Sequence, residues 1–567
     1  MAEVVRLPRA RRADLRAYGE PWRFAMGGAL AVGILLIAGF LLLVAWNGIS
    51  TFWPGPIAKV TLADGTLFAG EPTRSEIFQP SEDQLTGVAS EWRERIAAGD
   101  GFASRQLYRI GNYDLYNEDF RWATEYEVAA VEYPADLQFF ERVEWGPFVG
   151  RIVRADLGSG PLEGAALDEA ALHEAHTVAR ERWQEIRRLE RKEIGEVNRE
   201  MEAERLALRR AALRFGPESD EHRELAQRLE ADLASMQLEY DALAERARAL
   251  RAEDQRFRIT LADVNGREKE HLLSDVTRFY AANRLSTAGA LRVYLSRWGE
   301  FLSEEPREAN TEGGVLPAIF GTAAMTLLMV IAVAPFGVVT ALYLREYARQ
   351  GRLVSIVRIS VNNLAGVPSI VYGVFGLGFF AYTLGARIDQ LFYPERLPSP
   401  TFGTGGLLWA SLTLALLTVP VVIVATEEAL AAVPRSVREG SLACGASKWQ
   451  TIRRIVLPQA LPGIMTGLIL AMARGAGEVA PLMLVGVVKL APELPVDGIF
   501  PFVHFERSFM HLGFHIYDVG FQSRNSEAGK PMVYVTTLLL ITLIALMNAT
   551  AIVVRARLKR RFAGSQF

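Results

Sequence analysis

The stretch LILAMARGAGEVAPLMLVG, residues 468–486, is apolar and rich in small residues, yet it contains Arg474 and Glu478. A membrane-spanning helix needs roughly 20 apolar residues to cross about 30 Å of hydrocarbon, and this stretch qualifies when it is extended to 462–488. An ionised arginine at the centre of a bilayer costs about 2.5–3.5 kcal/mol on insertion scales. We therefore expect the two charges to face the interior of a helix bundle or a water-filled path.

The charged residues of this chain are concentrated in one region. Of 567 residues, 50% are hydrophobic and 22% are charged, and the net charge is −3, so the average resembles that of a large soluble protein. Most of the charge, however, lies between about residues 60 and 310. Five further windows are long and apolar enough to span a membrane: 24–46, 315–344, 359–386, 407–426 and 532–554. Together with 462–488 they predict an α-helical polytopic membrane protein with six transmembrane helices.

Lysine and arginine in the short flanks of the spans predict their orientation, because cytoplasmic flanks are enriched in these residues. The alternate loops 387–406 and 491–530 have no basic excess. Both termini are therefore expected in the cytoplasm, with residues 47–312 outside it. A cleaved signal peptide is the alternative for the first window, but the window is long and no small-residue cleavage pattern follows, which favours an anchor. The basic flanks are 1–23, 345–358, 427–462 and 555–562.

Two similar stretches bracket the middle of the external region. AKVTLADGTLFAGEP (58–72) and FRITLADVNGREKEHLLSD (257–275) share V/I-T-L-A-D followed by a glycine turn. Each predicts a short strand, a turn and a second strand. We expect the two to pair into one small β element, so that the external region is an α+β insertion.

Residues 166–254, between these stretches, are charged and predicted to be helical, with a break at 214–220. Apolar residues recur at alternating steps of 4 and 3 in the second half, as in a coiled-coil seam, and more loosely in the first half. A helical hairpin folded at Gly216 and Pro217 is expected. It is either a solvated stalk without a site or a docking arm for a partner. The seam residues are Ile194, Val197, Met201, Leu208, Met236, Tyr240, Leu243, Ala247 and Leu250.

No catalytic, metal or cofactor site is predicted. His173 and His176 are three residues apart in the predicted helix, but the setting is acidic and offers no third ligand. Cys444 is the sole cysteine, so an intrachain disulfide is excluded. The sequence has no Gly-x-x-x-x-Gly-Lys-Ser/Thr phosphate loop, so it is not expected to hydrolyse ATP itself.

The basic segment EGSLACGASKWQTIRRIVLP, residues 439–458, predicts a foot on the cytoplasmic face. A short helix, a bend at Gly445, a second helix with Trp449 and Ile452 on one side, and a stop at Pro458 would give it an L shape. Such a foot can transmit a mechanical displacement to the membrane helices.

The foot resembles the EAA loop of ABC importer permeases, with Gly440 and Ser441 in place of the usual alanines. NNLAGVPSIVYGVFGLG (362–378) and ARGAGEVAPLML (473–484) are similar to the third-span and fifth-span signatures of phosphate permeases of the PstA type, and GNYDLYNEDFRW (111–122) is similar to a periplasmic element of their long forms. The external region is much longer than in a compact permease. The residues that match the EAA loop are Glu439, Gly445, Ile455, Leu457 and Pro458.

This resemblance implies a permease subunit of a phosphate importer in the bacterial inner membrane. It also implies a second permease of the PstC type, an ATPase dimer of the PstB type below the membrane and a periplasmic phosphate-binding protein above it. The matching loop residues would couple the permease to the ATPase. Two alternatives stay open: a permease for another oxyanion such as sulfate or molybdate, and a nontransporting scaffold built on the hairpin.

Two roles are open for the charges in 468–486. Arg474 and Glu478 are spaced i, i+4 on a helix, so they can pair and join helices. The flanking Gly475, Gly477 and Pro481 favour a second role, because they let backbones approach closely and let a helix loosen. In that role the planar guanidinium of Arg474 donates hydrogen bonds to phosphate, and Glu478 holds the guanidinium in position when the path contains no phosphate.

Overall fold

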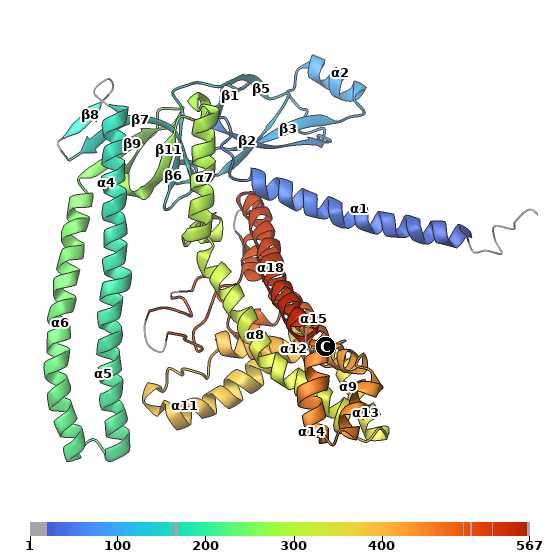
Figure 1. The fold of residues 1–567 in the computed structure, drawn as a ribbon. Coiled ribbons are helices and arrows are strands. Elements are labelled where there is room, and N and C mark those ends of the chain that lie inside the picture. Colours follow the sequence, from blue (N-terminus) through green and yellow to red (C-terminus); the bar gives the residue numbers. More distant parts are fainter. Residues whose placement is uncertain are drawn as a thin grey trace, which may run out of the picture.

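The computed structural model describes residues 20–158, 160–163, 168–491, 493–498, 502–523 and 526–563. Figure 1 shows a β-rich part with a long helical hairpin, and a bundle of apolar helices beside it. The described chain has six helical segments that are long and apolar enough to span a membrane, which confirms the predicted class. These segments are Trp22–Ser50, Leu316–Tyr347, Ser369–Phe392, Leu407–Ala431, Lys448–Gly477 and Ser526–Arg560.

Helix α12 lies at the centre of the bundle, where it packs against α8 and α15. Met325, Leu414 and Ala471 contribute to the buried core between these three helices. Helix α1 projects away from the bundle in Figure 1 and contacts α18, with Gly48 close to Leu538. The main helices are α1 (Glu20–Ser50), α8 (Leu316–Leu342), α12 (Leu407–Ala431), α15 (Leu457–Gly477) and α18 (Ser526–Ala563).

The third span begins later than predicted. The window 359–386 is divided, because α9 (Arg352–Leu364) ends and the span starts again at α10 (Ser369–Phe375). Pro368 separates the two helices, since proline has no N–H to donate and disfavours helical geometry in the residue before it. After α10 the span continues through a π-helical segment, η7 (Gly376–Gly385), and α11 (Ala386–Phe392).

The described residues form two large antiparallel sheets in the β-rich part and a third, two-stranded sheet of β12 (Pro306–Arg307) and β13 (Glu312–Gly313). The first has the strand order β4-β3-β2-β1-β5, and the second has the order β10-β9-β7-β6-β11, with β8 beside β7. The strands of the first sheet are β1 (Ala58–Leu62), β2 (Leu67–Phe78), β3 (Ala103–Arg109), β4 (Phe120–Thr124) and β5 (Val128–Glu132). Those of the second are β6 (Gln138–Arg142), β7 (Phe148–Leu157), β8 (Pro161–Glu163), β9 (Phe257–Ala262), β10 (Glu268–Leu272) and β11 (Val276–Tyr280).

The two V/I-T-L-A-D stretches form hairpins as expected, but the prediction that they pair with each other is wrong. The β1–β2 hairpin is in the first sheet and the β9–β10 hairpin is in the second. On their outer edges β1 pairs with β5 and β2 pairs with β3, so neither strand of the first hairpin is available to the second, in which β9 pairs with β7.

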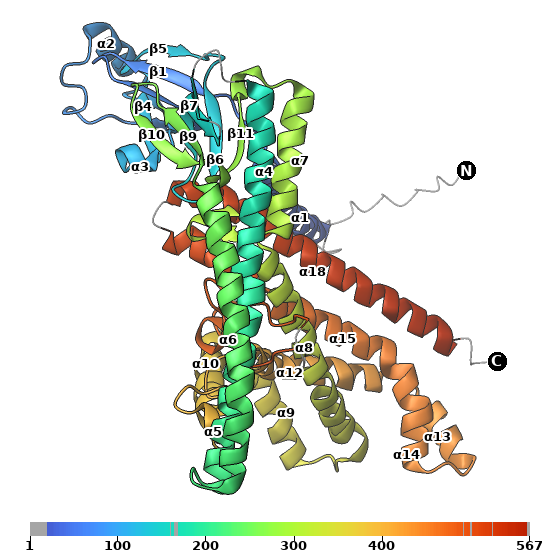
Figure 2. The same cartoon turned by 90° about the vertical axis from the view of Figure 1, so that its left-hand side faces the viewer.

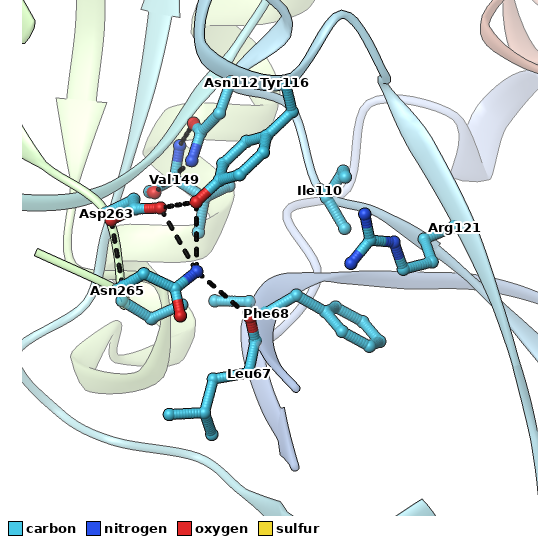
Figure 3. Close-up of a pocket in the computed structure, with 11 residues that line it drawn as sticks. Leu67, Phe68, Ile110, Asn112, Tyr116, Arg121, Val149, Asp263 and Asn265 are labelled. Atoms are coloured by element: carbon cyan, nitrogen blue, oxygen red, sulfur yellow. Dashed lines mark hydrogen bonds between the residues drawn. The ribbon is translucent and has the colours of Figure 1, made fainter. Parts of the chain in front are cut away.

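The two hairpins meet around the small cavity of Figure 3. The Asn265 amide nitrogen donates to the Leu67 carbonyl oxygen over 3.1 Å and contacts the Tyr116 hydroxyl over 3.0 Å. That hydroxyl in turn donates to Asp263. Tyr116 belongs to GNYDLYNEDFRW, so this stretch helps to join the two sheets.

The helical hairpin consists of α4 (Glu169–Arg188), a π-helical segment η2 (Leu189–Glu193), α5 (Ile194–Phe215) and α6 (Asp220–Asp254). The chain turns at Gly216, where a φ of 95° suits glycine. All of the predicted seam residues are buried or half-buried, as packing between α5 and α6 requires. The base is not a free stalk, however, because Leu172 and Ala179 of α4 belong to the core of the second sheet.

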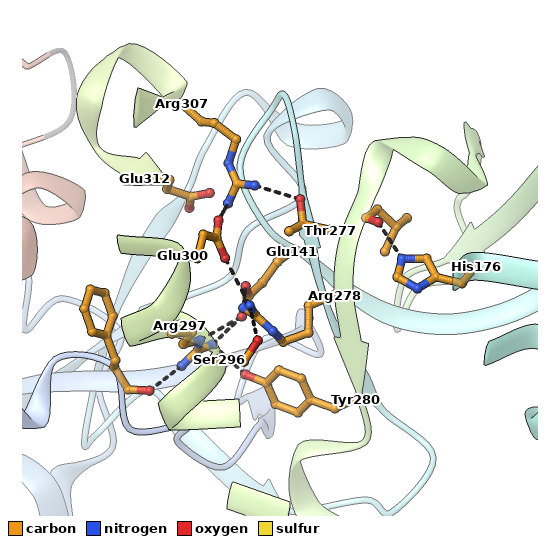
Figure 4. A network of polar contacts seen from close by, with 12 residues as sticks. Glu141, His176, Thr277, Arg278, Tyr280, Ser296, Arg297, Glu300, Arg307 and Glu312 are labelled. Carbon is orange, nitrogen blue, oxygen red and sulfur yellow. Dashed lines mark hydrogen bonds and ion pairs between the residues drawn. The ribbon is translucent and has the colours of Figure 1, made fainter. Parts of the chain in front are cut away.

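A buried polar network joins the second sheet to α7 (Thr287–Ser303), which leads into α8 (Figure 4). Glu141 on β6 pairs with Arg297 on α7 over 2.7 Å and with Arg278 on β11. Glu300 on α7 pairs with Arg278 over 3.0 Å and with Arg307. Burial alone raises the pKa of Glu141, but Arg297 and Arg278 outweigh it and hold that pKa below its usual range. The network therefore fixes the second sheet to α7, the helix that precedes α8.

Candidate functional site

The fifth span ends in a break, so residues 468–486 do not form one continuous helix. Helix α15 stops at Gly477, and Glu478 is extended, with φ −77° and ψ 133°. A single further turn, α16 (Leu482–Val485), follows Pro481. Pro481 is the N-cap of α16, a position where its missing N–H leaves no helical hydrogen bond unmade, so the helix can restart there. The predicted loosening of the helix is thus present in the structure.

Arg474 and Glu478 lie at this break and form a loose ion pair. The Arg474 Nε and Glu478 Oε1 atoms are 3.7 Å apart, which is beyond hydrogen-bond distance. The two side chains are 40% and 22% exposed. Arg474 also lies in the last turn of α15, where the helix dipole favours a positive charge. In the part of the chain that the structure describes, the guanidinium makes no close hydrogen bond, so its donors can serve another partner.

The break packs directly on the third-span signature. A Cβ atom on Gly373 of α10 would lie 2.7 Å from the Pro481 Cα atom and 2.9 Å from its carbonyl oxygen. The neighbouring Tyr372 donates its hydroxyl to the Leu364 carbonyl oxygen over 2.7 Å, which ties α10 back to the end of α9. The two stretches that carry the resemblance, far apart in the sequence, thus form one site.

The roles of Tyr372 and Gly373 were not identified from the sequence. Both lie in the quoted signature 362–378, so the motif itself was the available signal. Which residue of that signature contacts the fifth span depends on the packing angle of two helices, which a single sequence does not reveal. Among the described residues, no group of three metal-ligating side chains is present.

The predicted foot consists of α13 (Arg435–Ala443), a bend at Gly445, and α14 (Lys448–Thr451). Gly445 has a φ of 83°, in the left-handed region that favours glycine. The Ala446 N–H donates to the Ser441 carbonyl over 3.2 Å and the Gly445 N–H donates to the Leu442 carbonyl over 2.9 Å, as in a Schellman C-cap. A capping box between Ser447 and Gln450 then starts the next helix.

One detail predicted for the foot is wrong. Pro458 is not a stop, because the helical span continues through it from Lys448 to Gly477. The chain runs into α15 through the π-helical segment η9 (Ile452–Val456). Ile452 is buried, whereas Trp449 is exposed.

The other predicted coupling residues differ in their surroundings. Glu439 and Gly445 are exposed, and no atom lies within 4 Å of a Cβ placed on Gly445. Leu442 and Trp449 are exposed apolar side chains of the same foot. Ile455 and Leu457 are half-buried, and Leu457 packs in the core where the foot joins α12 and α15. The tip of the foot is therefore the part that is free to meet another protein.

Arg438 connects the foot to the end of the second span, which sequence reasoning did not reveal. Its guanidinium donates to the carbonyl oxygens of Leu430 over 2.6 Å and Val433 over 2.7 Å at the end of α12. It also pairs with Glu346 over 3.1 Å, in the π-helical segment η6 (Tyr343–Tyr347) that ends the second span. A displacement of the foot therefore acts on two spans at once.

Comparison with known proteins places the membrane part of the chain. Residues 334–562 match the family described as binding-protein-dependent transport system inner membrane component. The probable ABC transporter permease protein YqgH of Bacillus subtilis is 35% identical over 204 residues, which cover 35% of this chain and 62% of YqgH, somewhat less than two thirds of its length. The phosphate transport system permease protein PstA 1 of Mycobacterium tuberculosis is 35% identical over 250 residues, which cover 44% of this chain and 73% of the relative.

Similarity to solved structures is weaker. The inward-facing MetNI methionine ABC transporter is 19% identical, with a TM-score of 0.32 over 43% of this chain and 95% of that chain. A similarity this low supports no further detail of the fold.

Proposed function

This chain belongs to the binding-protein-dependent transport system inner membrane components and, among them, to the phosphate permeases of the PstA type, and from that premise we propose that it is a permease subunit of an ATP-driven phosphate importer. The observation that carries the proposal is the position of Arg474 in the last turn of α15, beside the break whose Pro481 packs against Gly373 of the third-span signature. A guanidinium presents a planar set of donors that matches two oxygens of a phosphate.

Arg474 and Glu478 act together as a substrate-sensitive latch in this proposal. Glu478 keeps the guanidinium in position when the path is empty, and the 3.7 Å separation shows that the carboxylate does not occupy the donors with close hydrogen bonds. A phosphate that enters the path then accepts hydrogen bonds from the Arg474 guanidinium. The backbone at Glu478 is extended, so the segment that follows α15 can shift without breaking helical hydrogen bonds.

The rest of the importer is supplied by other chains. We propose that the foot docks on an ATPase dimer of the PstB type, that a second permease of the PstC type completes the path, and that a periplasmic phosphate-binding protein delivers the substrate. The foot then lies in the cytoplasm and the two sheets lie on the periplasmic side of the inner membrane, with both termini cytoplasmic. The exposed Gly445, Leu442 and Trp449 support the docking of a partner at the tip of the foot.

The direct experiment measures ATP-dependent phosphate uptake with the ATPase and the second permease co-expressed. Arg474→Lys keeps the charge but loses the fork, so uptake should fall at least about tenfold, equivalent to about 1.4 kcal/mol, while the complex still assembles. Arg223→Lys, an exposed position on the hairpin, is the matched control and should transport normally.

A double variant separates the latch from a structural ion pair. Arg474→Met with Glu478→Gln removes both charges and leaves no unpaired charge in the membrane. The latch predicts an assembled complex that does not move phosphate. Recovery of uptake in the double variant would show that the pair only joins helices. Uptake of sulfate in place of phosphate would assign the chain to another oxyanion.

A further inference from the structure

Four arginines of the helical hairpin contact acidic residues in three separate loops on the sheet side of the bundle. Glu305, just before α8, pairs with Arg187 over 2.7 Å and with Arg191. Glu493, after the fifth span, pairs with Arg199 over 2.9 Å. These contacts are not explained by the transport path or by the foot.

The fourth contact lies nearest the tip of the hairpin. Arg210 of α5 pairs with Glu395, which lies just after the third span in the short 3₁₀ helix η8 (Pro394–Arg396). The Glu395 side chain is 1% exposed, whereas that of Arg210 is 60% exposed. One Glu395 oxygen, Oε2, has no hydrogen-bond partner in the described part of the chain. The charge of this carboxylate therefore depends on the hairpin for its close partner.

The hairpin lies across the bundle rather than pointing away from it. Figure 2 shows α5 and α6 running from the sheets down the side of the bundle, in front of α8, α10 and α12. Helix α5 and the segment η8 are in direct contact, which agrees with this view. Because α4, η2 and α5 form one continuous helical rod, a single element contacts all three loops.

The contact is electrostatic rather than apolar. None of the hydrophobic clusters formed by described residues joins α5 or α6 to the bundle. Apart from Glu395, the charged partners are partly exposed, so water and salt weaken their attraction. Such a contact can open and close without exposing a large apolar surface.

We propose that α4, η2 and α5 form an electrostatic clasp, a rod held by ion pairs across the sheet-side ends of the second, third and fifth spans, where the proposed transport path opens. When closed, the clasp holds the loops at Glu305, Glu395 and Glu493 in one arrangement, and at least the tip of the hairpin must release them before phosphate enters. The reason is geometric: alternating access moves helix ends relative to one another, and one rod cannot follow three loops that move apart. The role of the clasp rests on the proposed function, but its opening does not.

The opening is tested by pulsed electron paramagnetic resonance on the full complex, with Cys444→Ser to remove the sole native cysteine. Spin labels on Glu218→Cys, at the tip, and Ser399→Cys, near Glu395, report the distance between hairpin and loop. Adding Arg199→Glu with Arg210→Glu, or raising the salt concentration, should produce a second, longer distance.

The matched control replaces Arg223 and Arg248 with glutamate. Their ion pairs lie within α6, so this control should leave the distance between the spin labels unchanged. An unaltered distance in the Arg199→Glu and Arg210→Glu variant would overturn the clasp.

The role in transport is tested by joining the same two cysteines with a short bismaleimide. Cross-linked complex should take up phosphate at least tenfold more slowly than untreated complex, and the two single-cysteine proteins should be unaffected by the reagent. Cross-linked complex that transports at the untreated rate would refute the requirement for opening. If the untreated complex itself moves no phosphate, the proposed function fails, and the resonance measurement still decides whether the clasp opens.

Discussion

The contact between Gly373 and Pro481 offers a sharp test of how the transport site is built. A Cβ atom at residue 373 would lie 2.7 Å from the Pro481 Cα atom, 0.7 Å short of the 3.4 Å at which ordinary contact begins. The obstructing atoms are backbone atoms, so no flexible side chain can move aside. Gly373→Ala must therefore displace the segment that follows Glu478, or shift α10 by a similar amount.

The size of the effect follows from the cost of overpacking. Adding a methyl group to a filled site costs about 1–3 kcal/mol. If the whole of this free-energy cost destabilises the arrangement of groups that binds phosphate, transport falls about 5- to 150-fold, at about 1.4 kcal/mol for each factor of ten. Small displacements have large effects at such sites because binding groups must be held within a fraction of an ångström.

The assay compares initial rates of phosphate uptake, with size-exclusion chromatography to confirm that the complex assembles. Gly378→Ala is the matched control, since it lies in the same span and no atom is within 4 Å of its added Cβ. Gly378→Ala should transport at the wild-type rate. Equal uptake by the Gly373→Ala and Gly378→Ala complexes would refute the claim that this contact positions the site.

Three further predictions concern the foot and the hairpin. Gly445→Asp should cost about 1 kcal/mol of backbone strain and uncouple ATP hydrolysis from uptake, whereas Gly440→Ala, with open space and no positive φ, should stay coupled in an ATPase-to-uptake ratio. Arg438→Met should leave the chain inserted but weaken ATPase-driven uptake several-fold, and equal coupling would show that its contacts are not transmitting. Since Arg210 holds the pKa of Glu395 below its ordinary value, their pair should persist at neutral pH and be lost only as pH falls below the ordinary pKa of a glutamate side chain, which the spin-label distance reports.

The sequence alone determined the membrane class of this protein. Hydrocarbon thickness sets a minimum length for an apolar helix, so the six spans can be read as runs of residues without any knowledge of their neighbours. The same holds for the bend at Gly445 and the turn at Gly216, because each depends on the local backbone freedom of a single residue. The charged pair Arg474 and Glu478 was also visible, since its spacing lies within one helical turn.

Only the tertiary structure decided which distant segments meet. The two similar β-hairpins entered different sheets because β1 and β2 pair on their outer edges with β5 and β3, whereas β9 pairs with β7, and edge pairing is a long-range choice that a short motif does not encode. The contact of Gly373 with Pro481 and the pairing of four hairpin arginines with three loops arise in the same way. A charge or a small residue in a sequence shows what it can bind, but the packing of elements far apart in the chain determines what it reaches.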